Sequence, residues 1–200
     1  FICIIPHSKV EDFISIIIDN IELFGSRQEG GTNYMANYYV PFDLLRCVTS
    51  ENGLLTLVGF LANNCSHLSY ESQDTYDELV LQALKNAEPY LNSSSNLLDA
   101  ILNLAFEESK MSLGLDKKYV AFFSKGMVND LVFTKLCNTL NASEDRVNHY
   151  YAVGTLVNKQ NFDAFIDELT IDSLKILSDS IYDHDIKWQF KAEITIRKGI

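Results

Sequence analysis

The side chains of this sequence that could bind a metal or attack a substrate are few and far apart. Among four cysteines and four histidines, only Cys65 and His67 stand close together. A structural zinc site needs four ligands in paired short spacings, and no second pair accompanies these two residues. Residues two apart on a helix also face different directions, so a thiol activated by this histidine is not expected. We predict no metal site and no cysteine nucleophile.

Acidic residues form clusters that could serve in acid–base chemistry or in cation binding. The run Asp183–Asp185, with His184 in the middle, is interpreted as a solvated turn. The acidic pairs at 107–108 and 167–168 fall in helical patterns, in which adjacent side chains point in different directions. The sequence has no phosphate-binding glycine motif and no protease, hydrolase or kinase signature. We therefore predict no catalytic residues and no cofactor.

The charge balance restricts the kinds of partner. The chain has a net charge of −11 and an isoelectric point near 4.7. Nucleic-acid binding requires a basic surface that replaces condensed counterions, so we expect no nucleic-acid partner. Among protein partners, an acidic surface favours a basic segment. No uninterrupted apolar run approaches the ~20 residues of a membrane-spanning helix, so no membrane span is predicted.

The cysteines also indicate a cellular compartment. Cys47, Cys65 and Cys137 fall in apolar helical patterns, where a thiol packs as a small hydrophobic group. None forms a CxxC pair, and no signal peptide is visible, so we expect reduced cysteines in the cytoplasm or nucleus. The chain begins at Phe1 rather than at methionine, from which we expect it to be part of a longer or a processed protein.

Helical periodicity dominates the chain between short polar segments. The sequence is 47% hydrophobic, which is enough for a buried core, yet it has only three prolines and nine glycines. An all-β protein would need a turn about every ten residues and more turn-forming residues than these. We therefore predict an all-α fold. The expected helices span residues 10–24, 42–48, 54–63, 76–88, 97–108, 119–125, 129–140, 147–159, 162–169 and 173–182, with loops at 26–32 and 69–75.

Capping residues mark several of the predicted helix ends. Ser8 and Glu11 have the spacing of a capping box, in which the two residues satisfy each other's backbone amides at a helix start. Gly25 is placed to end the same helix, and Pro89 to end the helix over 76–88. Ser143 is the expected N-cap of the helix over 147–159.

The last segment carries two conflicting signals. From Ile186 to Ile196, apolar residues alternate with polar ones, which is the period of a half-buried β-strand. Asp185 as an N-cap and Gly199 beyond the end are typical of a helix. In an all-helical array a lone strand has no partner for its backbone groups, so the helix is favoured. A C-terminal strand over 186–197 is the alternative.

Two helical segments share a sequence pattern. Leu54–Ser66 and Leu97–Ser109 both open with Leu-Leu and repeat Leu-Ala seven residues later, at an offset of 43 residues. Val153–Asn158 matches Val58–Asn63 more loosely. A period near 40 built from helices is typical of a solenoid, in which neighbouring units cover each other's apolar faces. We predict a single helical domain over residues 1–200, with degenerate repeats near 42–91, 92–140 and 143–183.

The run Leu102–Ala105, with the sequence Leu-Asn-Leu-Ala, resembles the third helix of an armadillo repeat. The resemblance implies an armadillo/HEAT-like α-solenoid. In that family the third helices line a concave groove, and a repeated Asn holds the backbone of an extended peptide. The resemblance therefore assigns partner contacts to Asn103 and, on the matching helix, to Phe60 and Asn63.

The sequence also departs from the armadillo pattern. The family often has Trp four residues before the Asn, where this chain has Asp99, and only Asn103 matches the Asn itself. A ladder of Trp and Asn residues is therefore not expected. The segment Leu174–Ile196 resembles, in addition, the start of a COMM domain, which implies a strand around Trp188.

These patterns favour a non-catalytic function. The first hypothesis is a scaffold or protein-interaction module that binds a partner protein, with a basic segment, on a solenoid surface. The first alternative is a compact helical domain of structural or viral origin that acts by self-assembly. The second is an enzyme whose residues come together only in three dimensions.

Overall fold

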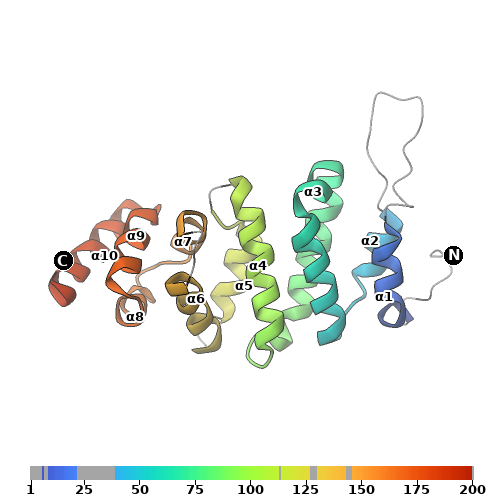
Figure 1. The fold of residues 1–200 in the computed structure, drawn as a ribbon, viewed down its shortest axis with the longest axis horizontal. Coiled ribbons are helices and arrows are strands. Elements are labelled where there is room, and N and C mark those ends of the chain that lie inside the picture. The colour runs from blue at the N-terminus through green and yellow to red at the C-terminus, as the bar shows by residue number, and fades with distance from the viewer. Residues whose placement is uncertain are drawn as a thin grey trace. The chain divides into compact units, whose positions relative to one another are not determined.

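The structure is a computed structural model that describes residues 6, 9–21, 39–112, 114–126, 130–142 and 146–199. All regular secondary structure in these residues is helical, which confirms the all-α prediction (Figure 1). The helices are α1 (Val10–Asp19), α2 (Tyr39–Leu45), α3 (Glu51–Ala87), the 3₁₀ helix η4 (Glu88–Tyr90), α4 (Ser95–Ser112), α5 (Lys117–Gly126), α6 (Asp130–Ala142), α7 (Arg146–Gly154), α8 (Phe162–Glu168), α9 (Ile171–Ser180) and α10 (His184–Lys198).

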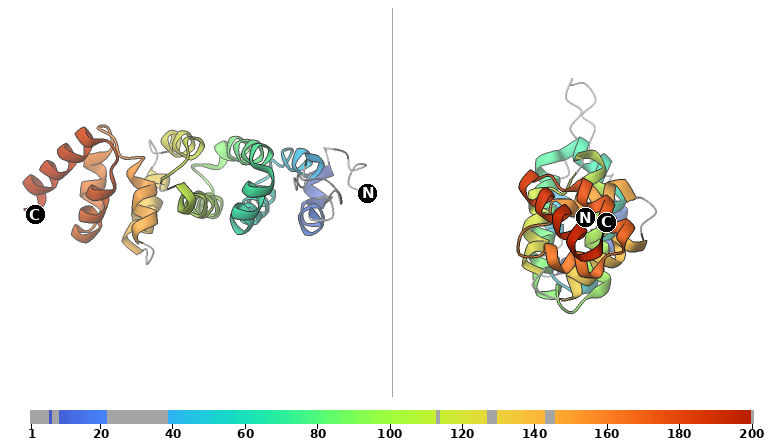
Figure 2. Two further views of the ribbon diagram at one scale, coloured as in Figure 1. Left: turned by 90° about the horizontal axis from the view of Figure 1, so that it is seen from above. Right: turned by 90° about the vertical axis from the view of Figure 1, so that its left-hand side faces the viewer.

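The chain divides into two compact units. Unit 1 comprises residues 1–104 and contains α1 to α3, η4 and the first part of α4. Unit 2 comprises residues 105–200 and contains the end of α4 and α5 to α10 (Figure 2). The solenoid and the repeats within one domain stay predictions.

Helix α3 folds back on itself. A straight helix of 37 residues would be ~55 Å long, yet the two ends of α3 meet. The Asn86 side chain donates to the Val48 carbonyl at 2.7 Å, and the Tyr90 hydroxyl donates to the Thr49 carbonyl at 3.0 Å. The resulting two arms overlap in Figure 1 and lie side by side in the view from above in Figure 2. The first arm begins at Glu51, and the second ends at Ala87.

The predicted loop at 69–75 is wrong, because these residues remain helical. Polar residues can extend a helix when they pair across one turn, as Gln73 does by donating to Asp77 at 2.9 Å. The apolar stripes predicted on either side of the loop are buried, with Leu54, Leu57 and Leu61 on the first arm, and Leu79, Val80 and Leu84 on the second.

In unit 2, α7 and α9 approach each other closely at one point. A Cβ atom at Gly154 would collide with the backbone carbonyl of Ser180, so only glycine fits there. Beyond Gly154, asparagine side chains bind the backbone in place of a further helical turn. Asn161 accepts the Asn158 amide at 2.8 Å and donates to the Leu156 carbonyl at 2.9 Å.

Two sequence predictions therefore fail at this point. The helix expected over 147–159 ends at Gly154, and Val153–Asn158 is a helix end and turn rather than a third copy of Val58–Asn63. The predicted residues Ser8, Gly25, Ser143 and 26–32 lie outside the described part of the chain. Within it, α3 ends just before Pro89, as predicted.

The C-terminal segment is a helix, and the alternative strand over 186–197 is wrong. Asp183 accepts the amides of Asp185 and Ile186 at 2.9 and 3.0 Å, and Gly199 ends the helix with a φ of 71°. Of the alternating apolar residues only Phe190 and Ile194, four apart, are fully buried. Burial at a spacing of four is the helical period, and a strand would bury every second residue.

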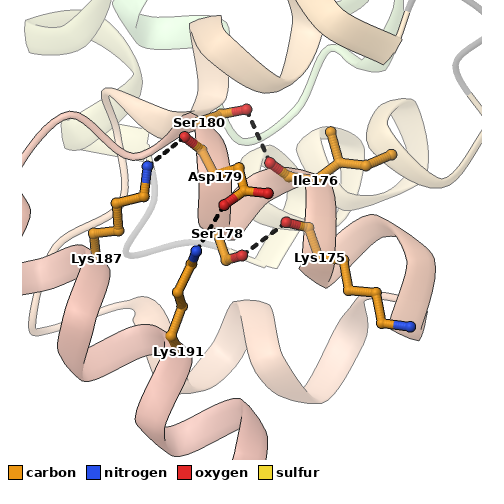
Figure 3. A network of polar contacts seen from close by, with 7 residues as sticks. All are labelled: Lys175, Ile176, Ser178, Asp179, Ser180, Lys187 and Lys191. Carbon is orange, nitrogen blue, oxygen red and sulfur yellow. Dashed lines mark hydrogen bonds and ion pairs between the residues drawn. The ribbon is translucent and has the colours of Figure 1, made fainter. Parts of the chain in front are cut away.

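Polar contacts hold α10 against α8 and α9. Lys187 donates to the Asp179 carbonyl at 2.6 Å, and Lys191 binds the Asp179 carboxylate at 2.7 Å (Figure 3). Arg197 bonds Asp163 at 3.0 Å and also bonds Asp167, both on α8. The lysines lie near the C-terminal end of α9, where the helix dipole favours positive charge.

Candidate interaction surface

Two serines fix the starts of successive helices in unit 1 in the same way. Ser50 precedes α3, and its hydroxyl oxygen accepts the Gly53 amide at 3.1 Å. Ser94 precedes α4, and its hydroxyl oxygen accepts the Leu97 amide at 3.2 Å. Each serine thereby satisfies one of the free N–H groups at a helix start.

A glutamate from an earlier helix holds each serine. Glu11 of α1 accepts the Ser50 hydroxyl at 2.5 Å, and it also accepts the backbone amides of Thr49 and Ser50 at 2.6 and 2.8 Å. Glu51, in the first turn of α3, accepts the Ser94 hydroxyl at 2.5 Å. The starts of α1, α3 and α4 are thus linked in series. The predicted capping box is corrected accordingly, because Glu11 serves the start of α3 and the N-cap of α1 is Lys9.

The hydrogen bonds to Glu11 determine its charge. Burial raises the pKa of Glu11, but the hydrogen bonds from Ser50 and Thr49 outweigh burial and hold its pKa below the ordinary value. The carboxylate is therefore ionised at neutral pH and can accept all three bonds. A negative charge at the N-terminal end of α3 is also favoured by the helix dipole.

Gly53 leaves the room that this contact needs. A Cβ atom at Gly53 would collide with the Glu11 carboxylate and with the side chains of Val48 and Ser50. The sequence gives no signal for this requirement, because Gly53 reads as an ordinary turn residue before a helix. Only the position of Glu11, which is 42 residues away in the sequence, explains it.

Matching the two helices by their capping serines changes the predicted register. Ser50 and Ser94 differ by 44 residues, not 43. At an offset of 44 most of the buried residues coincide. At 43, exposed Asn63 would be matched with buried Phe106. The matched buried residues are Leu54, Leu57, Val58, Leu61, Ala62 and Cys65 on α3, with Leu98, Ile101, Leu102, Ala105, Phe106 and Ser109 on α4.

The corrected register places Asn103 at the position of Gly59 rather than Phe60. Asn103 and Asn63 are both exposed, and Phe60 is half-buried, so all three predicted contact residues reach the surface of unit 1. A Cβ atom at Gly59 would meet nothing within 4 Å, so the first arm of α3 is open beside Phe60. We group Phe60, Asn63 and Asn103 with the exposed Asp99 under the name α3/α4 face.

The acidic charge of the chain is concentrated in unit 1. Residues 1–104 contain four Lys and Arg against thirteen Asp and Glu, a net charge of −9. Residues 105–200 contain twelve against fourteen, a net charge of −2. In unit 1, Arg46 is paired with Glu78 at 2.5 Å, and Lys9 with Asp12 at 3.5 Å. Unit 1 therefore attracts positively charged partners more strongly than unit 2 does.

The residues considered first for chemistry are not brought together. Within the described chain, no group of three or more histidine, cysteine, aspartate or glutamate side chains is placed to hold a metal ion. Within the same described residues, Cys47, Cys65 and Cys137 form no disulfide. Burial, with a smaller contribution from the charge of Glu168, raises the pKa of Cys137 to about 12, so this thiol is protonated at neutral pH. Cys3 lies outside the described residues.

The Asp183–Asp185 cluster serves the start of α10. Asp183 is the N-cap of that helix, and all three residues are exposed.

Comparison with family models, curated proteins and solved structures found no match for this chain. Among the described residues, no helix has the length and apolar character needed to cross a membrane.

Proposed function

We propose that this chain is a non-catalytic protein-interaction module that binds a basic segment of a partner protein on the α3/α4 face. The observation that carries the proposal is the serial linkage of helix starts, Glu11 to Ser50 and Glu51 to Ser94. This linkage positions two exposed helix surfaces that carry Asn63 and Asn103. A rigid surface loses little conformational entropy when a partner binds.

The chemistry of the face suits an extended peptide. An asparagine side chain has both a donor and an acceptor, so Asn63 and Asn103 can bind the backbone of a peptide without regard to its sequence. Phe60 is half-buried and supplies an apolar contact. The open space at Gly59 allows a peptide backbone to lie close to the helix.

The charge of unit 1 supplies the preference among partners. A net charge of −9 over residues 1–104 speeds encounter with Lys- and Arg-rich segments and repels nucleic acid. We place the protein in the cytoplasm or nucleus. Supporting this are the half-buried Cys47 and the buried Cys65 and Cys137, none of which forms a disulfide within the described residues.

Site-specific photo-crosslinking tests the proposal. A photoreactive residue replaces Asn103 in one variant and Asn138 in a second. Asn138 is an exposed asparagine in the middle of α6, in unit 2, so it is a matched control. We expect the variant at position 103 to capture a partner from cell extract and the control to capture none. Mass spectrometry should locate the crosslink in a Lys- or Arg-rich segment of the partner.

Two further variants separate face binding from loss of the fold. Asn63→Ala and Phe60→Ala, each combined with the crosslinker at position 103, should reduce capture, while circular dichroism shows unchanged helix content. Equal capture at positions 103 and 138, or crosslinks only to acidic segments, would contradict the proposal.

A further inference from the structure

Helix α10 in unit 2 exposes an apolar stripe. Trp188 and Ile196 are 71% and 77% exposed, the highest values among the large apolar side chains of the described residues. Ala192 lies midway between them and is also exposed. Residues spaced by four share one face of a helix. Single exposed apolar residues are common, but an exposed Trp within such a stripe is typical of a contact surface.

The stripe is held facing outward. Phe190 and Ile194, on the opposite side of α10, are buried, and Lys187, Lys191 and Arg197 bind α8 and α9. Rotation of α10 to bury the stripe would break these contacts and expose the buried pair. In Figures 1 and 2, no other drawn helix of unit 2 lies beyond α10.

The two edges of the stripe carry opposite charge. At 100° per residue, His184, Lys191 and Lys198 fall along one edge, at a spacing of seven residues. The centre line of the stripe runs along the helix through Ala192. Asp185 and Glu193 fall on the side of this line opposite to the basic residues. The helix carries four Lys and Arg against two Asp and Glu, in a chain whose net charge is −11. The net charge of α10 is therefore opposite in sign to that of the whole chain, so this helix does not add to the acidic charge that makes two copies repel each other.

We propose that a second copy of this chain docks on this stripe, with the two α10 helices parallel and related by a two-fold axis that runs along them. Trp188, Ala192 and Ile196 then meet the same residues of the second copy, and the small Ala192 allows close approach. This surface is separate from the α3/α4 face, and the proposal does not depend on the function proposed for that face.

The charged edges decide the direction of the pair. A two-fold axis parallel to the helices places the basic edge of one copy beside the acidic edge of the other, so that Lys191 faces Glu193 of the second copy on both sides. An antiparallel pair would instead place Glu193 beside Glu193 and Lys191 beside Lys191, which costs energy. The ammonium of Lys191 has three donors, so it can keep its bond to Asp179 in the pair.

Trp188 is the only tryptophan of the chain, so its fluorescence reports on this surface alone. As protein concentration rises, we expect the emission to move to shorter wavelength, acrylamide quenching to fall, and the mass measured by light scattering to double. Ile196→Ser keeps the tryptophan and should weaken the association about ten-fold. Ile171→Ser removes an exposed isoleucine from α9 and should leave the association unchanged.

Glu193→Gln tests the direction of the helices. In the parallel pair this change removes an attraction, so we expect the dissociation constant to rise about two- to five-fold. A fall in the dissociation constant would show that two Glu193 side chains meet, which would overturn the parallel arrangement. A mass of one chain at every concentration, or an association that Ile196→Ser leaves unchanged, would overturn the docking of a second copy.

Discussion

The two units of this chain fix their helices by different means. In unit 1, a carboxylate from an earlier helix holds the serine at the start of a later one, as in the contacts of Glu11 with Ser50 and of Glu51 with Ser94. In unit 2, α9 and α10 are fixed by close backbone packing at Gly154 and by lysines near the end of α9. Hydrogen bonds to an ionised carboxylate depend on pH, whereas packing of backbone against backbone does not.

The same contrast extends to the surfaces of the two units. Unit 1 has a net charge of −9, and its α3/α4 face is polar and open at Gly59. Unit 2 is nearly neutral, and its α10 exposes Trp188 and Ile196. A polar acidic face suits a basic partner, and an apolar stripe suits another apolar surface. The two units therefore support two different proposals about binding.

The largest effect is expected in the packing of unit 2. In Gly154→Ala, the added methyl group collides with the backbone of Ser180, which cannot move away without displacing α9. We expect a loss of about 3 kcal/mol in the free energy of unfolding, as for other overpacked sites. Urea unfolding followed by Trp188 fluorescence and by circular dichroism would measure it. A variant as stable as the wild type would show that α7 and α9 are not in close contact.

A smaller loss is expected from the helix starts of unit 1. Glu11→Ala removes three hydrogen bonds at the start of α3, and we expect a loss of about 1–2 kcal/mol. Asp74→Ala, at an exposed position within α3, is a control that removes a carboxylate away from this contact. Hydrogen exchange should become faster at the amides of residues 49–54. Faster exchange in α10 instead would contradict the assignment of Glu11 to unit 1.

An effect of opposite sign is expected at Gly59. Because Gly59 lies within α3 and a Cβ atom there has open space, Gly59→Ala should raise the free energy of unfolding by about 0.5–1 kcal/mol. Gly53→Ala is the matched comparison, and it should lower stability because the methyl group would displace the Glu11 carboxylate. If both substitutions changed stability in the same direction, the account of Gly53 would be wrong.

The smallest effect concerns pH. The pKa of Glu11 is lower in the folded chain than its ordinary value, so its contribution is fully present above the unfolded-state pKa. The contribution is lost as pH falls through the lowered folded-state pKa. Stability profiles of the wild type and Glu11→Gln, measured by urea unfolding at a series of pH values, should differ near neutrality and converge in acid. Parallel profiles would contradict the hydrogen bonds to this carboxylate.

The sequence predicted the helical class well but not the contacts that fix the helices. Apolar residues at spacings of three and four identified most helices, including the buried stripes of α3. The same patterns could not show that Glu11 reaches Ser50, because a long-range contact leaves no periodic signal. The segment ending at Ile196 was ambiguous, since its alternation fits two periods. The Asp183 cap, the left-handed Gly199 and the burial of Phe190 and Ile194 together decide for a helix.

The candidate site was predicted in part. Asn103, Phe60 and Asn63 were chosen from a resemblance, and all three reach the surface, but the matching of Phe60 with Asn103 was one residue out of register. Two Leu-Leu pairs suggested the offset of 43, whereas the capping serines require 44. Helix caps mark the start of a helix more directly than leucines do, because many leucine registers satisfy the same apolar face.

Binding of a basic segment on the α3/α4 face is the central claim, and amide hydrogen exchange tests it most directly. Exchange would be measured for the chain alone and with the Lys- or Arg-rich peptide identified by crosslinking at position 103. We predict slower exchange at residues 56–63 and 99–103 on adding the peptide, and no change in α10. Protection confined to α10, or protection that persists unchanged in Asn103→Ala, would contradict the claim.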